Sequence, residues 1–140
     1  MVGTAAERTP PEQPRARRTP AATGRAGLGR YGEDLAARYL GDRGYAVIDR
    51  NWRCAHGEID IVATRGGCLV VCEVKTRTGT GFGDPVEAVT VAKVLRLRRL
   101  AATYVRERDL HPSHLRIDVV GILVRDGRPA SVRHVEGVGG

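Results

Sequence analysis

Residues 56–76 read HGEIDIVATRGGCLVVCEVKT, two largely apolar runs on either side of a Gly66-Gly67 pair. In each run apolar residues recur at alternate positions, which is the pattern of a β-strand with one buried face. A Gly-Gly pair between two such runs is a strong signal for a tight hairpin turn, because glycine adopts the positive φ angles that the turn requires. We therefore predict an antiparallel hairpin with strands over 56–64 and 68–76.

The register of this hairpin gathers charged residues. With a two-residue turn at the glycine pair, Asp60 lies directly opposite Glu73, and Glu58 lies opposite Lys75. Side chains on a strand alternate between two faces, so these four residues share one face at the open end of the hairpin. The other face is apolar and suited to burial, and it is expected to carry Ile59, Ile61, Ala63, Val70, Cys72 and Val74.

Two carboxylates that face each other across a strand pair repel each other. If they are partly buried, the pKa of at least one should rise, or a cation should lie between them. Mg²⁺, or Mn²⁺ in its place, is the hard ion that such a site holds, bound by one or two carboxylates and by water. Lys75 could then orient a water molecule or stabilise negative charge on a phosphate. The alternative is an exposed face on which Glu58 pairs with Lys75 while Asp60 and Glu73 point into solvent.

The rest of the chain indicates further elements on both sides of the hairpin. The expected elements are a helix from Leu28 that ends at Gly41 or Gly44, a strand over 45–53, a loop over 79–84, a long helix from Pro85 to about Arg108, and strands over 115–124 and 130–135. The helices follow from apolar stripes at spacings of three and four, and Pro85 suits a first helical turn. The order α-β-β-β-α-β-β predicts an α/β domain in which helices flank a mixed sheet.

Residues 1–24 differ in composition from the rest of the chain. They hold four of the seven prolines, four arginines and two glutamates, with almost no large apolar side chain. That composition is typical of a disordered tail, and we assign the folded domain to residues 25–140. The tail contributes +2 to the net charge of +7. The domain itself is therefore basic, which favours a polyanionic partner such as nucleic acid.

The second expected helix is the best candidate for contact with that partner. Lys93, Arg96 and Arg99 line one side of it, apart from its apolar stripe. Lysine and arginine contacts to phosphates position a nucleic acid without selecting a sequence. Arg77, two residues beyond Lys75, is expected to reach the same phosphates. The alternative for these residues is a solvated basic face without a partner.

The hairpin residues also resemble a known motif. The spacing Asp60-x12-Glu73-x-Lys75 resembles the PD-(D/E)XK motif of the restriction-endonuclease-like superfamily. Over residues 28–136 the chain resembles the bacterial YraN family of small proteins, whose nearest characterised relatives are the archaeal Holliday junction resolvases. The segments that carry this resemblance are, in order, GRYGEDLAARYL, NWRCAHGEIDIVA, CEVKTR, FGDPVEAV and LRIDVVGI.

The resemblance implies a restriction-endonuclease-like core and a Mg²⁺- or Mn²⁺-dependent phosphodiesterase site. In that site Asp60 and Glu73 bind the metal, and Lys75 is the lysine of the motif. Resolvases add a catalytic glutamate early in the first helix, and Glu33 stands at that position. The Pro-Asp pair that names the motif is absent, because Ile59 precedes Asp60 where the motif has proline. A homodimer is expected only by resemblance to resolvases.

Three further observations on acids leave alternatives open. Glu33 lies beside the core-facing stripe of the first helix, where it either completes the site or benefits from the helix N-terminus. Glu58 either supports the metal site or pairs with Lys75. Asp118 interrupts the apolar strand LRIDVV, and we expect a structural hydrogen bond there in preference to a metal ligand.

These observations predict a nucleic-acid-binding hydrolase, a Mg²⁺-dependent endonuclease that acts on structured or branched DNA in repair or recombination. The alternatives are a non-catalytic nucleic-acid-binding module with the same fold, and a protein-interaction domain with an acidic pocket. No apolar run reaches the length of a membrane span and no secretory signal is visible, so we expect no membrane partner and a cytoplasmic protein. The residues Cys54, His56, Cys68 and Cys72 match no common zinc spacing.

Overall fold

The computed structural model describes residues 24–79 and 84–139. Its elements are, in chain order, α1 (Gly24–Asp42), β1 (Ala46–Cys54), β2 (Gly57–Arg65), β3 (Cys68–Thr78), the 3-10 helix η4 (Pro85–Ala88), α2 (Val91–Glu107), β4 (His114–Arg125) and β5 (Arg128–Val135). This order confirms the mixed α/β class. The predicted tail lies outside the described residues, except that Gly24 begins α1. None of the helices in this part of the chain is long and apolar enough to span a lipid bilayer.

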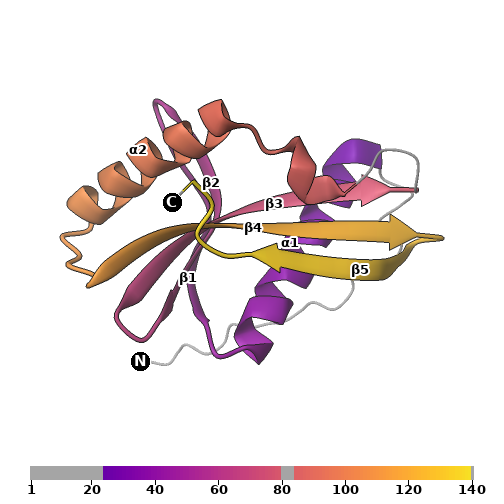
Figure 1. Cartoon of the computed structure of the whole chain (residues 1–140), viewed down its shortest axis with the longest axis horizontal. Coiled ribbons are helices and arrows are strands. Elements are labelled where there is room, and N and C mark those ends of the chain that lie inside the picture. The colour runs from indigo at the N-terminus through magenta and orange to yellow at the C-terminus, as the bar shows by residue number, and fades with distance from the viewer. Residues whose placement is uncertain (1–23, 80–83, 140) are drawn as a thin grey trace, which may run out of the picture.

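The five strands form one sheet in the order β1-β2-β3-β4-β5, so every strand lies beside its neighbour in the sequence. β3 and β4 run parallel, and the other three pairs are antiparallel. A parallel pair needs a crossover connection, and here the connection contains η4 and α2. α1 lies against one face of the sheet and α2 against the other (Figure 1). The central strands β2, β3 and β4 are therefore covered on both faces, while β1 and β5 remain largely exposed.

The predicted register of the central hairpin is confirmed. The ladder between β2 and β3 runs from the turn to Ile61 opposite Cys72, in the register expected for a two-residue loop. Gly66, in that loop, has a φ of 62°, which is the left-handed conformation that favours glycine. Counted from the turn, the β2–β3 ladder ends at Ile61 and does not reach Asp60. β2 stays paired with β1 as far as Gly57, the first residue of β2. β2 and β3 therefore separate at the end of the hairpin that carries the acids.

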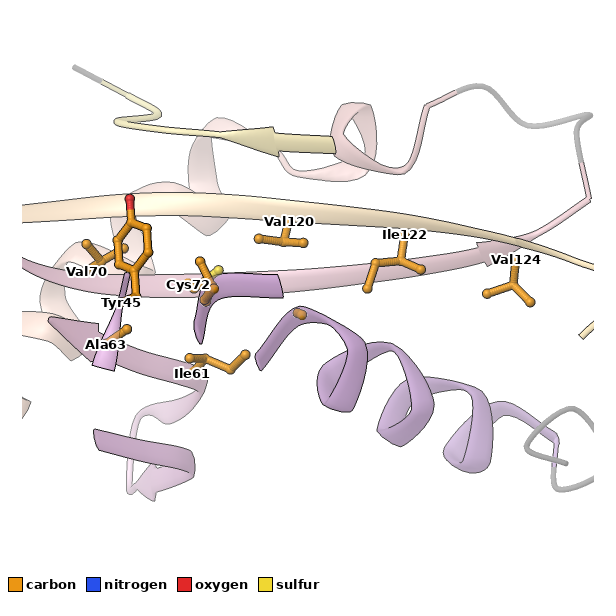
Figure 2. Close-up of a cluster of buried hydrophobic side chains, with 10 residues drawn as sticks. Tyr45, Ile61, Ala63, Val70, Cys72, Val120, Ile122 and Val124 are labelled. Atoms are coloured by element: carbon orange, nitrogen blue, oxygen red, sulfur yellow. The ribbon is translucent and has the colours of Figure 1, made fainter. Parts of the chain in front are cut away.

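The face toward α1 is an apolar core. Its buried members are Ala36, Leu40, Tyr45, Ile61, Ala63, Val70, Cys72, Val120, Ile122 and Val124. Figure 2 shows Val120, Ile122 and Val124 of β4 in a row that faces α1, with Ile61 and Cys72 nearby. Most of the apolar face predicted for the hairpin is buried here.

Ile59 is the exception, and its predicted placement beside Ile61 is wrong, because it packs in the core under α2. Beyond Ile61, β2 no longer follows β3 and is guided by β1, where Trp52 is the ladder partner of Ile59. Trp52 packs edge-on against Tyr104 of α2, with ring centroids 5.3 Å apart. The separated end of β2 thus turns its apolar side toward α2. The same core contains Val62, Leu69, Val71, Leu97, Leu100, Ala101 and Ile117.

The long helix predicted from Pro85 to Arg108 is wrong in one respect, because it is two helices. η4 ends before Val89, which is extended with φ −89° and ψ 118°. Thr90 then caps α2, and its Oγ1 atom accepts a hydrogen bond from the Lys93 amide at 3.1 Å. An N-cap hydroxyl satisfies an amide that has no partner within its own helix. The threonine therefore starts a new helix.

η4 packs closely on β4 at Gly121. A Cβ atom at that position would lie 2.8 Å from Val86 Cγ2 and 3.2 Å from the Val86 amide nitrogen. A larger residue would push η4 away from the sheet. Because only two residues separate η4 from α2, this close contact also positions the start of α2.

Candidate active site

Asp60 stands where β2 parts from β3. Its Oδ2 atom accepts a hydrogen bond from the Val74 amide of β3 at 2.8 Å. This bond follows directly after the last ladder pair, Ile61 with Cys72, and it satisfies a backbone amide where the strands separate. Asp60 and Glu73 are neighbours, as predicted, but the link between their strands is this side-chain bond and not a further ladder pair.

The surroundings of Asp60 disfavour its charge. Burial, followed by the negative charge of Glu73, raises the pKa of Asp60 from 3.8 to about 7. The hydrogen bond from Val74 opposes this shift, while the charges of Glu33 and Glu58 add to it. Burial and the neighbouring acids thus favour the protonated form of Asp60, and a cation bound beside it would favour the ionised form.

Glu73 of β3 is almost completely buried, with 5% of its surface exposed. Two ammonium groups approach the same carboxylate atom. Lys75 Nζ lies 3.7 Å from Glu73 Oε2, and Lys93 Nζ lies 3.4 Å from it. A buried carboxylate without such partners would be costly. The motif residues Glu73 and Lys75 are thus in contact, as their placement on one face of a strand predicts.

Lys93 belongs to this cluster, although the sequence predicts it only as a phosphate contact on an outer helix face. It stands in the first turn of α2, where its side chain is one-third exposed and reaches the buried carboxylate of Glu73. No local pattern marks this contact, because the two residues belong to different elements. Only the position of α2 above the sheet brings them together.

Glu33 lies in α1, near the same acids. Burial raises the pKa of Glu33, while a hydrogen bond from Asn51 and the charge of Arg50 limit the shift. α1 begins at Gly24, roughly two and a half turns earlier, so stabilisation by the helix N-terminus does not explain Glu33, since that effect falls off within the first turn. The charge of Glu33 acts on Asp60, so the two acids lie near each other.

Gly32 allows α1 to bring Glu33 this close. A Cβ atom at Gly32 would overlap Thr76 Oγ1 and lie 3.0 Å from Thr76 Cβ. Any side chain at Gly32 would push α1 away from β3 at Thr76, the residue that follows Lys75. The glycine in GRYGED is therefore a packing residue that sets the distance between α1 and the sheet.

Glu58 has a partner other than the one considered from the sequence. Its carboxylate forms an ion pair with Arg53 at 3.4 Å, and the two residues are ladder partners of β2 and β1. The alternative pairing of Glu58 with Lys75 is wrong, because β2 leaves β3 before that point and Lys75 contacts Glu73.

The predicted phosphate-binding arginines do not form one surface. Arg77 lines a hollow beside η4 whose other walls are Asp84, Glu87 and Ala88. Arg96 and Arg99 are exposed and follow Lys93 along α2, where they line a groove together with His56. The structure therefore aligns Arg96 and Arg99 with the lysine that touches Glu73, and it places Arg77 among acids.

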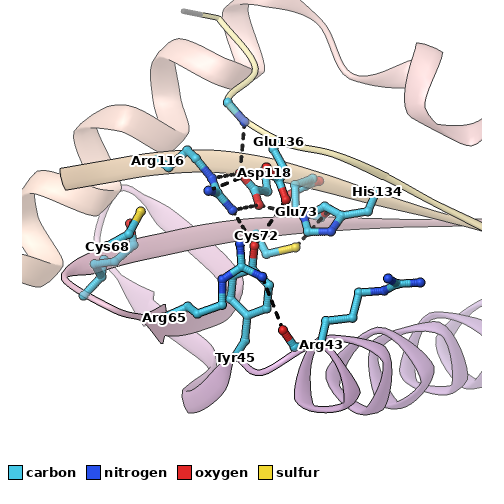
Figure 3. A network of polar contacts seen from close by, with 12 residues as sticks. Arg43, Tyr45, Arg65, Cys68, Cys72, Glu73, Arg116, Asp118, His134 and Glu136 are labelled. Atoms are coloured by element: carbon cyan, nitrogen blue, oxygen red, sulfur yellow. Dashed lines mark hydrogen bonds and ion pairs between the residues drawn. The ribbon is translucent and has the colours of Figure 1, made fainter.

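Asp118 is the centre of a second buried polar cluster (Figure 3). Arg116 donates two hydrogen bonds to its carboxylate, both at 2.8 Å, and His134 Nε2 lies 2.7 Å from Oδ2. Burial acts to raise the pKa of Asp118, but the bonds from His134, Arg116 and the Gly137 amide outweigh it and lower the pKa. Arg116 also donates to the Tyr45 hydroxyl at 2.6 Å. This agrees with the structural role expected for Asp118, although its partners were not foreseen.

The donor atoms beside Asp60 suit a hard divalent cation. Within residues 24–79 and 84–139, no group of three or more His, Cys, Asp or Glu side chains is arranged to enclose a metal ion. Mg²⁺ needs no such enclosure, because it keeps several waters and takes one or two carboxylates plus substrate phosphates. In the same part of the chain, Asp60 Oδ1 and Glu73 Oε1 accept no hydrogen bond. The two carboxylates therefore supply oxygen atoms that suit such an ion.

Comparison with known proteins covers most of the chain. Residues 32–122 match the uncharacterised protein family UPF0102. A UPF0102 protein of Streptomyces griseus is 56% identical over 116 residues, which cover 81% of this chain and 97% of the relative. A UPF0102 protein of Rhodococcus opacus is 51% identical over 108 residues, which cover 77% of this chain and 92% of the relative. The matched segment includes all the residues that meet at Glu73 and Asp60.

Proposed function

Because the chain belongs to the uncharacterised protein family UPF0102, the YraN-type family expected from its motifs, we propose its function from the site itself. We propose that it is a Mg²⁺-dependent endonuclease of the restriction-endonuclease-like superfamily. Its substrate is structured or branched DNA of the kind met in repair or recombination. The observation that carries the proposal is a pair of neighbouring carboxylates, Asp60 and Glu73, together with the lysines that contact Glu73.

The electrostatics of this pair support the proposal. The pKa of Asp60 is raised to about 7 by burial and by Glu73, and a cation bound beside the two acids would relieve their repulsion. Lys75 and Lys93 lie within 4 Å of Glu73, so positive charge is also available to a phosphate that approaches the carboxylates. Acids that attract a cation, beside lysines that attract an anion, form a pattern suited to a metal-assisted phosphodiesterase.

Each residue has a role in this reading. Asp60 and Glu73 would hold the ion through carboxylate oxygens. A bound Mg²⁺ would supply charge neutralisation at the phosphate and would activate a water molecule. Lys75 stabilises the negative charge that develops on the phosphate or orients the attacking water, and Lys93 adds a second positive charge at the same edge. Glu33 completes the acidic surroundings of Asp60 from α1.

The architecture also supports the proposal. The resemblance to PD-(D/E)XK proteins implies a mixed sheet that is flanked by helices. Asp60 lies on β2 and Glu73 on β3 of such a sheet. The two strands separate at the acids, so the ladder between β2 and β3 does not continue past Asp60 and Glu73.

The proposal is tested with labelled Holliday junction, flap, duplex and single-stranded DNA in the presence of Mg²⁺, Mn²⁺ or EDTA. The wild type should cut or nick at least one branched substrate only when a metal is present. Asp60→Asn and Lys75→Ala, purified in the same way, should both lose this activity. A wild type that binds Mn²⁺ but cuts none of the substrates would exclude the endonuclease.

A non-catalytic nucleic-acid-binding module is the second candidate, and one observation favours it. Two ammonium groups beside Glu73 already neutralise much of the site's charge, so the folded protein is not dependent on a metal. Such a module would bind the same DNA panel equally well with EDTA and with Mg²⁺. We also propose a cytoplasmic protein and, by resemblance to resolvases alone, a homodimer. Light scattering after gel filtration checks the dimer.

A further inference from the structure

A basic groove runs along the outward side of α2. It has a volume of about 560 Å³ and is lined by His56, Arg96, Arg99, Leu100, Thr103 and Arg106. That volume is in the range of sites that hold a small ligand or a segment of a larger one. Leu100 and neighbouring small side chains supply an apolar surface, and arginines and a histidine supply the polar groups.

The basic residues of the groove recur along one side of α2, and Lys93 of the candidate active site precedes the first of them by one helical turn. Arg96, Arg99 and Arg106, with Thr103 between the last two, recur at spacings of three and four, which places them on one side of a helix. Lys93 precedes Arg96 by three residues and touches Glu73 at 3.4 Å. The row from Lys93 to Arg106 is roughly 20 Å long at 1.5 Å per residue. The basic positions therefore continue from Lys93 along α2, although Lys93 itself does not line the groove.

The opposite wall is the turn between β1 and β2, which rises beside α2 (Figure 1). Gly57, directly after His56, has a φ of 147°, and a Cβ atom there would lie 3.2 Å from Leu100 Cδ1 and 3.8 Å from Arg96 Cδ. Glycine therefore allows the turn to approach the helix. Because the turn lies so close to α2, the basic side chains of the helix line a groove.

The charges in the groove are available to a ligand. Within the described residues, Arg96, Arg99 and Arg106 form no ion pair, and no acid lines the groove. Arginines on other sides of α2 are engaged with the protein itself. Arg98 donates to the Gly139 carbonyl at 3.3 Å, and Arg108 pairs with Asp49 at 2.8 Å. Among the described arginines of α2, those whose guanidinium groups make no hydrogen bond or ion pair are therefore the three that line the groove.

From this arrangement we propose that the groove binds the phosphodiester backbone of the nucleic-acid strand that flanks the reacting phosphate. The inference rests on the proposed function for the location of that phosphate. Arginine suits the partner, because its guanidinium group contacts a phosphate through two parallel hydrogen bonds. The row also gives the strand a direction, with the cleaved phosphate at Lys93 and the flank extending toward Arg106.

The test measures binding without cleavage, by fluorescence anisotropy of labelled branched and duplex DNA in EDTA at several salt concentrations. The double variant Arg99→Ala/Arg106→Ala should bind at least tenfold more weakly at moderate salt. The slope of log K against log salt should flatten by roughly 0.9 for each lost phosphate contact. The matched control is Arg125→Ala/Arg128→Ala, which removes the same charge from exposed residues at the turn between β4 and β5. This control should bind like the wild type.

The outcomes separate this inference from the proposed function. Normal binding by the groove variant, or an equal loss in the control variant, would overturn the groove even if the wild type cuts DNA. A wild type that binds through the groove but never cuts would leave the groove standing and remove the endonuclease. Absence of any binding to DNA, or to RNA of the same sequence, would overturn the groove as well. Circular dichroism confirms that both double variants are folded.

Discussion

Lys93 Nζ lies 3.4 Å from Glu73 Oε2, nearer than Lys75 Nζ at 3.7 Å. The closest cation to the buried carboxylate of β3 therefore comes from α2 and not from the motif. Its side chain is no more than one-third exposed, so the pair is only partly screened by solvent. In the absence of a metal, Lys93 balances charge at the site and ties α2 to the sheet. A divalent cation that binds Glu73 has to compete with it.

Replacing Lys93 with Met tests this competition. The variant keeps most of the apolar stem and removes a positive charge next to a proposed ligand. We expect its affinity for Mn²⁺ to rise by about tenfold, which corresponds to about 1.4 kcal/mol, as measured by isothermal titration calorimetry. Arg98→Met on the same helix is the control, because Arg98 contacts Gly139. Equal affinities in Lys93→Met and the wild type would show that the ammonium group does not compete with the ion.

Asp60→Asn tests the raised pKa of Asp60 through the pH dependence of the free energy of unfolding. Because the folded pKa of about 7 lies above the ordinary 3.8, the folded protein retains a proton that the unfolded chain has lost between these values. The wild type should therefore lose stability as the pH rises through this window, by up to about 1.4 kcal/mol per unit. The variant has no such proton to lose and should be the more stable protein at pH 8. Urea unfolding at pH 5 to 8 in EDTA measures both.

The same variant tests the metal. Mg²⁺ at a hundredfold excess over its dissociation constant should stabilise the wild type by about 2.7 kcal/mol and should leave Asp60→Asn unchanged. Asp109→Asn, at an exposed position, should respond like the wild type. If Mg²⁺ stabilises none of the three and Asp60→Asn simply unfolds more easily at every pH, the carboxylate is held by protein hydrogen bonds and the metal site should be abandoned.

Gly32→Ala tests the close packing of α1 on β3. Its Cβ atom would overlap Thr76 Oγ1, so we expect a loss of about 1–3 kcal/mol in the free energy of unfolding, from overpacking. Gly29→Ala in the same helix meets nothing within 4 Å and should be neutral or stabilise by about 0.5–1 kcal/mol. Adding Thr76→Ala to Gly32→Ala should recover part of the loss. No recovery in the double variant would mean that the collision is not with Thr76.

Asp118→Asn tests the buried cluster at β4 and β5. The substitution leaves Arg116 without the charge that its two hydrogen bonds meet, and we expect a cost of about 3 kcal/mol at pH 7. Since the pKa of Asp118 is lowered in the folded protein, its stabilisation is present above the ordinary value near 3.8 and is lost as the pH falls below it. The difference between variant and wild type should therefore shrink in acid. Asp126→Asn, at an exposed turn position, should stay within about 0.5 kcal/mol of the wild type.

The central hairpin could be predicted because its information is local. Alternating apolar residues and the Gly66-Gly67 turn set a register that is confirmed to Ile61 opposite Cys72. That register also brought Asp60 and Glu73 together, and the element order led to the mixed α/β class. Each of these features depends on residues close together in the chain, where strand periodicity and turn geometry act directly.

Contacts between distant segments could not be read in this way. Lys93 reaches Glu73 because the first turn of α2 lies over this residue of β3. The position of that turn follows from the break at Val89 and from the packing of η4 on Gly121. The partners of Asp118 come from β4, from β5 and from the segment that follows β5. Periodicity tells which side of an element is buried, but it carries no information on how far two packed elements are shifted along each other. That shift is decided by steric fit in the core, where one Cβ atom more or less moves a helix. The acids of the site could therefore be predicted from the sequence, but which cations contact them was decided by the tertiary structure.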